Sequence, residues 1–122
     1  MIGYLTLGTN NMDRAAAFYD ALLAEIGAKR AMQSDRFIFW GNNPKAAMLG
    51  IIHPANGEPA TVGNGAMAAI QVKSAEEVDK VYAKAMALGA TDEGPAGPRG
   101  KGFYAGYFRD LDGNKLNVFF MG

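Results

Sequence analysis

Two residue types that dominate metal centres and nucleophilic active sites are almost missing from this chain of 122 residues. It contains no cysteine and only one histidine, His53. Without cysteine, the chain forms no disulfide, thiolate nucleophile or zinc–thiolate site. With one imidazole, it cannot build a two-histidine metal site within one protomer. His53 precedes Pro54 at the expected end of a strand, where a surface or hydrogen-bonded role is more typical than that of a catalytic base.

An excess of either charge is also lacking. Twelve basic residues balance twelve acidic ones, and no basic run appears, so we expect neither a nucleic-acid nor a membrane partner. The first residues show no basic segment followed by a long apolar one, and no apolar run approaches the roughly 18 residues of a membrane span. We therefore expect a cytoplasmic protein.

The first half of the chain shows a strand, a helix and further strands. Residues 2–9 are β-leaning, and the apolar positions of residues 12–26 repeat with the 3.6-residue period of a helix that ends at Gly27. Two short apolar runs follow, at residues 37–40 and 46–52, and both predict strands. The segment 54–65 is rich in proline and glycine and predicts a loop.

The same order then begins again. Residues 67–72 predict a strand, and Ser74 with Glu77 forms a capping-box pattern in front of a helix that stops at Gly89. The segment 94–102, rich in glycine and proline, predicts a loop. Residues 103–108 and 116–121 predict strands joined by a turn at Asp112-Gly113.

The two halves match residue by residue. Tyr4 lies 15 positions before Tyr19, as Met67 does before Tyr82, and Gly27-Ala28 corresponds to Gly89-Ala90. Such internal repetition indicates a duplicated supersecondary unit. We expect one α+β domain over residues 1–122, with duplicated βαβββ modules in a cupped mixed sheet and helices on its outer face. Module 1 spans about residues 1–54, the linker 55–64 and module 2 65–122.

Three stretches resemble one known family. They are the opening strand and helix (residues 2–12 and 17–23), the start of the second half (residues 63–67) and the ending Phe103-Tyr-Ala-Gly-Tyr-Phe-Arg-Asp-Leu-Asp-Gly-Asn114. In this order they resemble the vicinal-oxygen-chelate superfamily of glyoxalases, bleomycin-resistance proteins and extradiol dioxygenases. The resemblance covers essentially the whole chain and implies a homodimer.

Metal-using members of this family hold a divalent ion with histidines and glutamates from the first and last strands of each module. The resemblance places Tyr4, Met67 and Asn117 at three of these ligand positions, and the fourth near residues 47–49. None of these residues is a histidine or carboxylate, the ligands that such ions prefer. We therefore expect no metal and no other cofactor.

Strand alternation predicts which side chains face away from the helices. Five residues fall on that concave face: Tyr4, Thr6, Met67, Gln71 and Asn117. They either fill a collapsed cavity or line an apolar pocket with a few polar groups, as small-molecule sites usually do.

Five further residues are candidates of less certain orientation. Tyr104 and Tyr107 have opposite parity, so only one of them faces the cup, and Trp40 poses the same question. Arg99 and Lys101 lie in the glycine-rich segment, which could act as a lid that binds an anionic group or could be an ordinary solvated loop.

Three functions remain open at this point. The favoured one is metal-independent binding of a small organic molecule, as in bleomycin-resistance-type members. The second is a lyase, isomerase or dioxygenase whose metal is held by other residues or across a dimer. The third is a non-catalytic interaction domain. Nothing in the sequence selects the ligand.

Overall fold

The computed structural model describes residues 1–122. The chain forms two compact units, Met1–Val62 and Gly63–Gly122. Both units have the order strand, helix and three strands. The eight strands form two four-stranded mixed sheets. This confirms the α+β fold with duplicated βαβββ modules.

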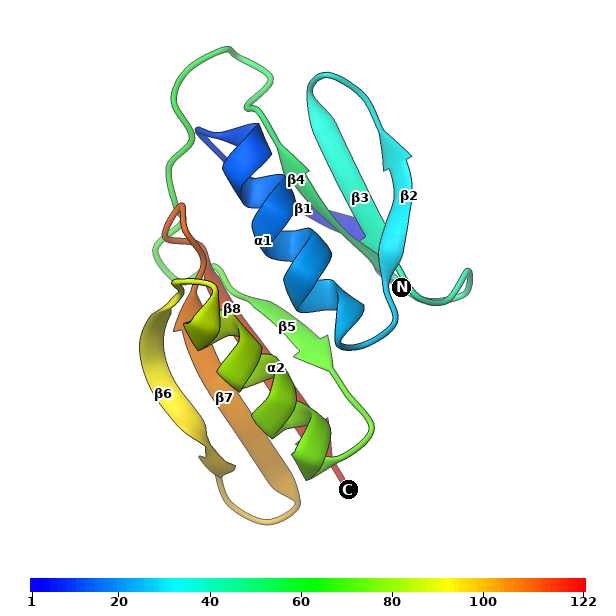
Figure 1. Ribbon diagram of the computed structural model, residues 1–122, viewed down its shortest axis with the longest axis vertical. Coiled ribbons are helices and arrows are strands. Elements are labelled where there is room, and N and C mark those ends of the chain that lie inside the picture. The colour runs from blue at the N-terminus through cyan, green and yellow to red at the C-terminus, as the bar shows by residue number, and fades with distance from the viewer. The chain divides into compact units, whose positions relative to one another are not determined.

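In the first unit, one helix covers one face of a four-stranded sheet (Figure 1). The elements are β1 (Tyr4–Gly8), α1 (Met12–Ala24), β2 (Lys29–Gln33), β3 (Phe37–Gly41) and β4 (Met48–Ile52). The strand order is β1-β4-β3-β2, with β1 parallel to β4 and the other neighbours antiparallel. The helix contacts β2, β3 and β4.

The second unit repeats this arrangement, with its helix lying along the sheet (Figure 1). Its elements are β5 (Ala68–Gln71), α2 (Ala75–Ala87), β6 (Thr91–Pro98), β7 (Phe103–Arg109) and β8 (Lys115–Met121). The order is β5-β8-β7-β6, and the first strand is again parallel to the last. The helix contacts β6, β7 and β8.

Local sequence explains both helices. The side chain of Asn11 caps α1 by accepting the N–H of Arg14, and Ser74 caps α2 by accepting the N–H of Glu77. The capping box differs from its expected form, because the Glu77 carboxylate accepts the N–H of Lys73 at 2.9 Å rather than that of Ser74. Each helix has 13 residues, and neither is long and apolar enough to cross a membrane.

Two strands escaped the sequence analysis. The first is β2, whose five residues are all exposed and therefore show no apolar pattern. The second is β6, which occupies most of the segment predicted as a glycine-rich loop, so that prediction was wrong. Glycine and proline are tolerated there because β6 lies at a sheet edge and pairs with β7 through bulges around Gly94.

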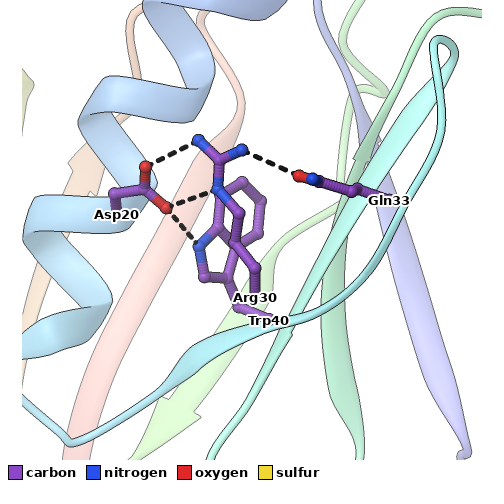
Figure 2. A network of polar contacts seen from close by, with 4 residues as sticks. All are labelled: Asp20, Arg30, Gln33 and Trp40. Atoms are coloured by element: carbon purple, nitrogen blue, oxygen red, sulfur yellow. Dashed lines mark hydrogen bonds and ion pairs between the residues drawn. The ribbon is translucent and has the colours of Figure 1, made fainter.

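A carboxylate joins three elements of the first unit. Asp20 of α1 accepts the indole N–H of Trp40 on β3 at 2.9 Å (Figure 2). Its carboxylate also accepts from Nε and Nη2 of Arg30 on β2, at 2.9 and 2.7 Å. Arg30 also donates to Gln33. Trp40 is only 2% exposed, so its N–H needs this acceptor. The network thereby fixes the indole between helix and sheet.

Substitutions at Asp20 separate the two interactions. Asp20→Ala leaves the buried Trp40 N–H without an acceptor and should lower the free energy of unfolding by about 1–3 kcal/mol. Asp20→Asn keeps an acceptor oxygen and loses only the exposed ion pair, which contributes little, so its cost should be smaller. Urea denaturation at neutral pH measures both. Equal losses in the two variants would contradict this assignment.

Asp20 should also make the free energy of unfolding depend on pH in the acid range. The hydrogen bond from Arg30 holds the pKa of Asp20 below its usual value, and Trp40 and the charge of Arg30 act in the same direction against partial burial. A depressed pKa in the folded state stabilises the protein above the unfolded value of about 3.9. That stabilisation is lost as the pH falls through the folded pKa. The Asp20→Asn variant should therefore lose less stability than the wild type below about pH 4.

Candidate functional site

The strand register defines a helix-free face on the first sheet. In the pairing of β1 with β4, Tyr4 lies directly beside (level with) Met48, and Thr6 beside Gly50. Gly50 in turn lies beside Phe39 of β3. Tyr4 is 60% exposed, and its ring meets the edge of the Phe39 ring at a centroid distance of 5.0 Å. Tyr4 and Thr6 therefore lie on this face, and their hydroxyls make no hydrogen bond within the chain.

The second sheet has an equivalent helix-free face. Asn117 of β8 is level with Ala69 on one side and Tyr107 on the other, and Gln71 is level with Phe119. Gln71 is exposed and carries no hydrogen bond. Met67, which precedes β5, is 46% exposed. This face, too, presents an apolar surface with few polar groups.

Asn117 lies on the second face but is not available as the sequence suggested. It is 2% exposed, and its amide nitrogen donates to the carbonyls of Gly106 and Val118 at 3.1 and 3.3 Å. Its side chain thus links β8 to β7. We correct its role from a ligand contact to a strand-bridging residue.

Trp40 and Tyr104, whose orientation the sequence leaves open, lie on the helix side of their sheets. The indole of Trp40 bonds to α1 through Asp20, and the hydroxyl of Tyr104 donates to Asp79 of α2 at 2.7 Å. Tyr107, of opposite parity in the same strand as Tyr104, is therefore on the helix-free face.

The two candidate lid residues lie in the turn after β6. The guanidinium of Arg99 donates to the carbonyls of Pro95 and Pro98 and lies 5.7 Å from the centre of the Tyr107 ring. Lys115 lies at the same distance from that ring. The contacts of Arg99 thus hold it against β6 and Tyr107. Lys101 is exposed in the following turn.

Two tyrosine–aspartate pairs fasten α2 to its sheet. The hydrogen bond to Asp79 raises the pKa of Tyr104, since ionisation would set a phenolate against a carboxylate. Partial burial and a 2.7 Å bond to Asp92 raise the pKa of Tyr82. Both phenols therefore stay protonated and structural at neutral pH.

The register also shows which residues correspond between the modules. Tyr4 corresponds to Met67, and Thr6 therefore corresponds to Ala69. Thr6 pairs with Gly50 and Ala69 pairs with Asn117, so Gly50 and Asn117 are equivalent positions. The fourth ligand position of the family is therefore Gly50, just outside the range 47–49 expected from the sequence. Glycine, like the residues in that range, supplies no metal ligand.

The side-chain position at Gly50 is filled by a neighbour. A Cβ atom placed on Gly50 would lie 2.3 Å from the ring of Phe39, so this ring covers β4 where a ligating carboxylate would stand. Tyr4 and Phe37 contact the same ring edge to face, at centroid distances of 5.0 and 5.3 Å. Sequence reasoning missed Gly50, and it left open which of Phe39 and Trp40 faces away from the helix. Placing Trp40 on the helix side would have put Phe39 on the opposite face by alternation.

The residues at the family's four positions do not fit a divalent metal. They are Tyr4, Gly50, Met67 and Asn117, and no group of three or more histidine, cysteine, aspartate or glutamate side chains is close enough to hold an ion. His53 lines an open hollow of about 320 Å³ with Glu58, Thr9 and Asn10. No reaction step through a metal is derived from this chain.

Comparison with known proteins identifies the family. The model of the Glyoxalase/Bleomycin resistance protein/Dioxygenase superfamily matches residues 1–118, and the chain belongs to this superfamily. A glyoxalase/bleomycin resistance protein from Albidiferax ferrireducens is 36% identical, with a TM-score of 0.89 over 98% of this chain and 97% of that one. No curated protein sequence matches the chain.

Two more distant structures show the same fold. A lactoylglutathione lyase from Agrobacterium tumefaciens is 24% identical, with a TM-score of 0.72 over 98% of this chain and 92% of that one. A fosfomycin resistance protein, FosX, from Listeria monocytogenes is 21% identical, with a TM-score of 0.71 over 98% and 91%. At these identities the likeness concerns the fold alone.

The packing of Phe39 on Gly50 can be tested by substitution. Gly50→Ala should lower the free energy of unfolding by about 1–3 kcal/mol, the usual cost of overpacking, because the ring is wedged between two other aromatic rings. Combining it with Phe39→Leu should cost less than the sum of the single changes. Gly3→Ala is the control, since a Cβ there meets no atom within 4 Å. A Gly50→Ala variant as stable as this control would contradict the packing.

Proposed function

We propose that this protein is a metal-independent member of the superfamily that binds a small, flat organic molecule on its helix-free sheet faces, as a cytoplasmic homodimer. The observation that carries the proposal is the cluster of Tyr4, Phe39 and Gly50. At the position where a metal-using relative needs a ligand, this chain has an aromatic ring, and beside it an exposed second ring.

The chemistry of this cluster suits an apolar or aromatic ligand. Exposed aromatic rings offer a large contact area and prefer offset or edge-to-face partners. On the first face, the free hydroxyls of Tyr4 and Thr6 supply the few polar contacts that orient a ligand on an otherwise apolar surface. On the second face, the free amide of Gln71 offers such a contact. No general base or nucleophile stands in the cluster, which favours binding over catalysis.

Methionine methyl groups make the proposal testable without knowledge of the natural ligand. Met32 is level with Phe39, whereas Met86 lies in α2. With methyl-labelled methionine, titration with the neutral probes indole and catechol should shift the NMR signal of Met32 and leave that of Met86 in place.

Variants of the two tyrosines provide a matched comparison. Tyr4→Ala should weaken probe binding about tenfold, since the ring contact is lost, and Tyr4→Phe should retain most of it. Tyr104→Phe, on the helix side, should have no effect. The proposal fails if neither probe binds, or if Tyr4→Ala and Tyr104→Phe behave alike.

Metal analysis tests the competing enzyme hypothesis. The purified protein should contain no divalent metal in stoichiometric amount, and EDTA should leave its melting temperature unchanged, because a metal bound only by the folded state would raise it. Stoichiometric nickel, zinc, manganese or iron would overturn the metal-independent assignment and favour a site assembled across a dimer.

A further inference from the structure

A hollow of about 590 Å³ lies at one end of the first sheet. Its wall comes from the residues before β1, the turn between α1 and β2, and the β3–β4 loop. The lining residues that matter here are Lys29, Lys45, Asn42, Asn43, Ile2 and Met48. Volumes of about 300–1,000 Å³ are typical of small-molecule pockets. The wall does not include Tyr4, Thr6 or Phe39.

The charge of this wall is one-sided. Lys29 and Lys45 both line it, and no acidic residue does. Neither ammonium group has an ion-pair or hydrogen-bond partner in the chain, although the chain as a whole has as many acidic as basic residues. Two unpaired cations around one hollow raise the local concentration of small anions.

The loop that carries Lys45 is held in place before any ligand arrives. Asn42 donates its side-chain amide to the carbonyl of Ile26 at the end of α1, at 3.2 Å. Asn43 accepts the backbone N–H of Lys45 at 2.9 Å, and its carbonyl accepts the N–H of Ala46. The loop therefore needs little ordering on binding, which favours affinity.

The remaining wall is apolar or open. Ile2, Ala31 and Met48 supply hydrophobic surface. A Cβ atom on Gly3 or Gly27 would meet nothing within 4 Å, so space is left beside the backbone at both ends of the hollow. Two cations above an apolar floor match a molecule with an anionic head and an apolar body.

We infer that this hollow is a binding site for a small organic anion, a carboxylate or phosphate ester with an apolar body, held by Lys29 and Lys45. Lysine is a point charge without a directional fork, so the site selects for charge and size more than for the geometry of the head. The inference goes beyond the proposed function, because its residues are not those of the Tyr4–Phe39 cluster.

The experiment uses the full chain with isotope-labelled backbone amides and two probes of similar shape, benzoate and benzyl alcohol. Because Met48 is level with Tyr4, the backbone amide of Lys45, which lines the hollow, is the reporter. Benzoate should shift the Lys45 signal to saturation with that of Met86 unchanged, and benzyl alcohol at the same concentration should not shift it. Benzoate affinity should fall as ionic strength rises, since exposed charges are screened by salt.

Charge-neutral variants identify the residues. Lys29→Gln combined with Lys45→Gln should weaken benzoate binding about tenfold. Lys73→Gln combined with Lys80→Gln, two exposed lysines of the second unit, removes the same charge and should leave binding unchanged. Gly3→Leu, which adds bulk to the wall at a position where a Cβ atom meets nothing within 4 Å, should block benzoate independently of charge.

Several results would overturn the inference. These are no benzoate binding at all, an equal shift of the Lys45 signal by benzyl alcohol, or equal loss in the two double-lysine variants. Loss of benzoate binding in Tyr4→Ala but not in the Lys29/Lys45 variant would assign the anion to the aromatic face instead, which would support the proposed function and reject this site. If indole fails to bind, and benzoate still shifts the amide signal at position 45 in the wild type but not in the Lys29/Lys45 variant, the proposed function fails and this inference stands.

Discussion

The parallel pairing of the first and last strands in each module determines which side chains each sheet presents on its helix-free face. In both units the register aligns them residue by residue, and a strand has only two faces. Once Leu5 or Ile70 turns toward the helix, Tyr4, Thr6 and Gln71 must turn away from it. The side chains on the helix-free faces are therefore a consequence of core packing, and a slip of one residue would exchange the two sets.

Much of this arrangement could be predicted from the sequence, because apolar periodicity and the internal repeat report directly on core packing. What escaped prediction depended on context. The edge strand β6 contains glycine and proline, a composition that predicts a loop. All residues of β2 are exposed, so its sequence has no apolar pattern that would predict a strand. Trp40 and Tyr104 needed a partner on the helix to settle their direction. The sequence shows which residues of a strand share a face. Only the hydrogen bonds to Asp20 and Asp79 show which of the two faces is turned toward the helix.

The two modules use one frame for different chemistry. Gly50 and Asn117 occupy equivalent positions. The absence of a side chain at Gly50 makes room for the ring of Phe39, whereas the amide of Asn117 joins two strands. Duplication allows such divergence because each sheet keeps its own helix and its own core. The family fold thus persists while equivalent positions of the two sheets carry side chains of different chemistry.

The ring of Phe39 over Gly50 also bears on how this chain could evolve. A carboxylate cannot return at position 50 while the ring is in place, and a smaller residue at position 39 alone would leave a void next to Tyr4. A metal ligand at position 50 would therefore need a coupled change at position 39. A further substitution at Met67 or Asn117 would still be needed to complete a set of histidine and carboxylate ligands.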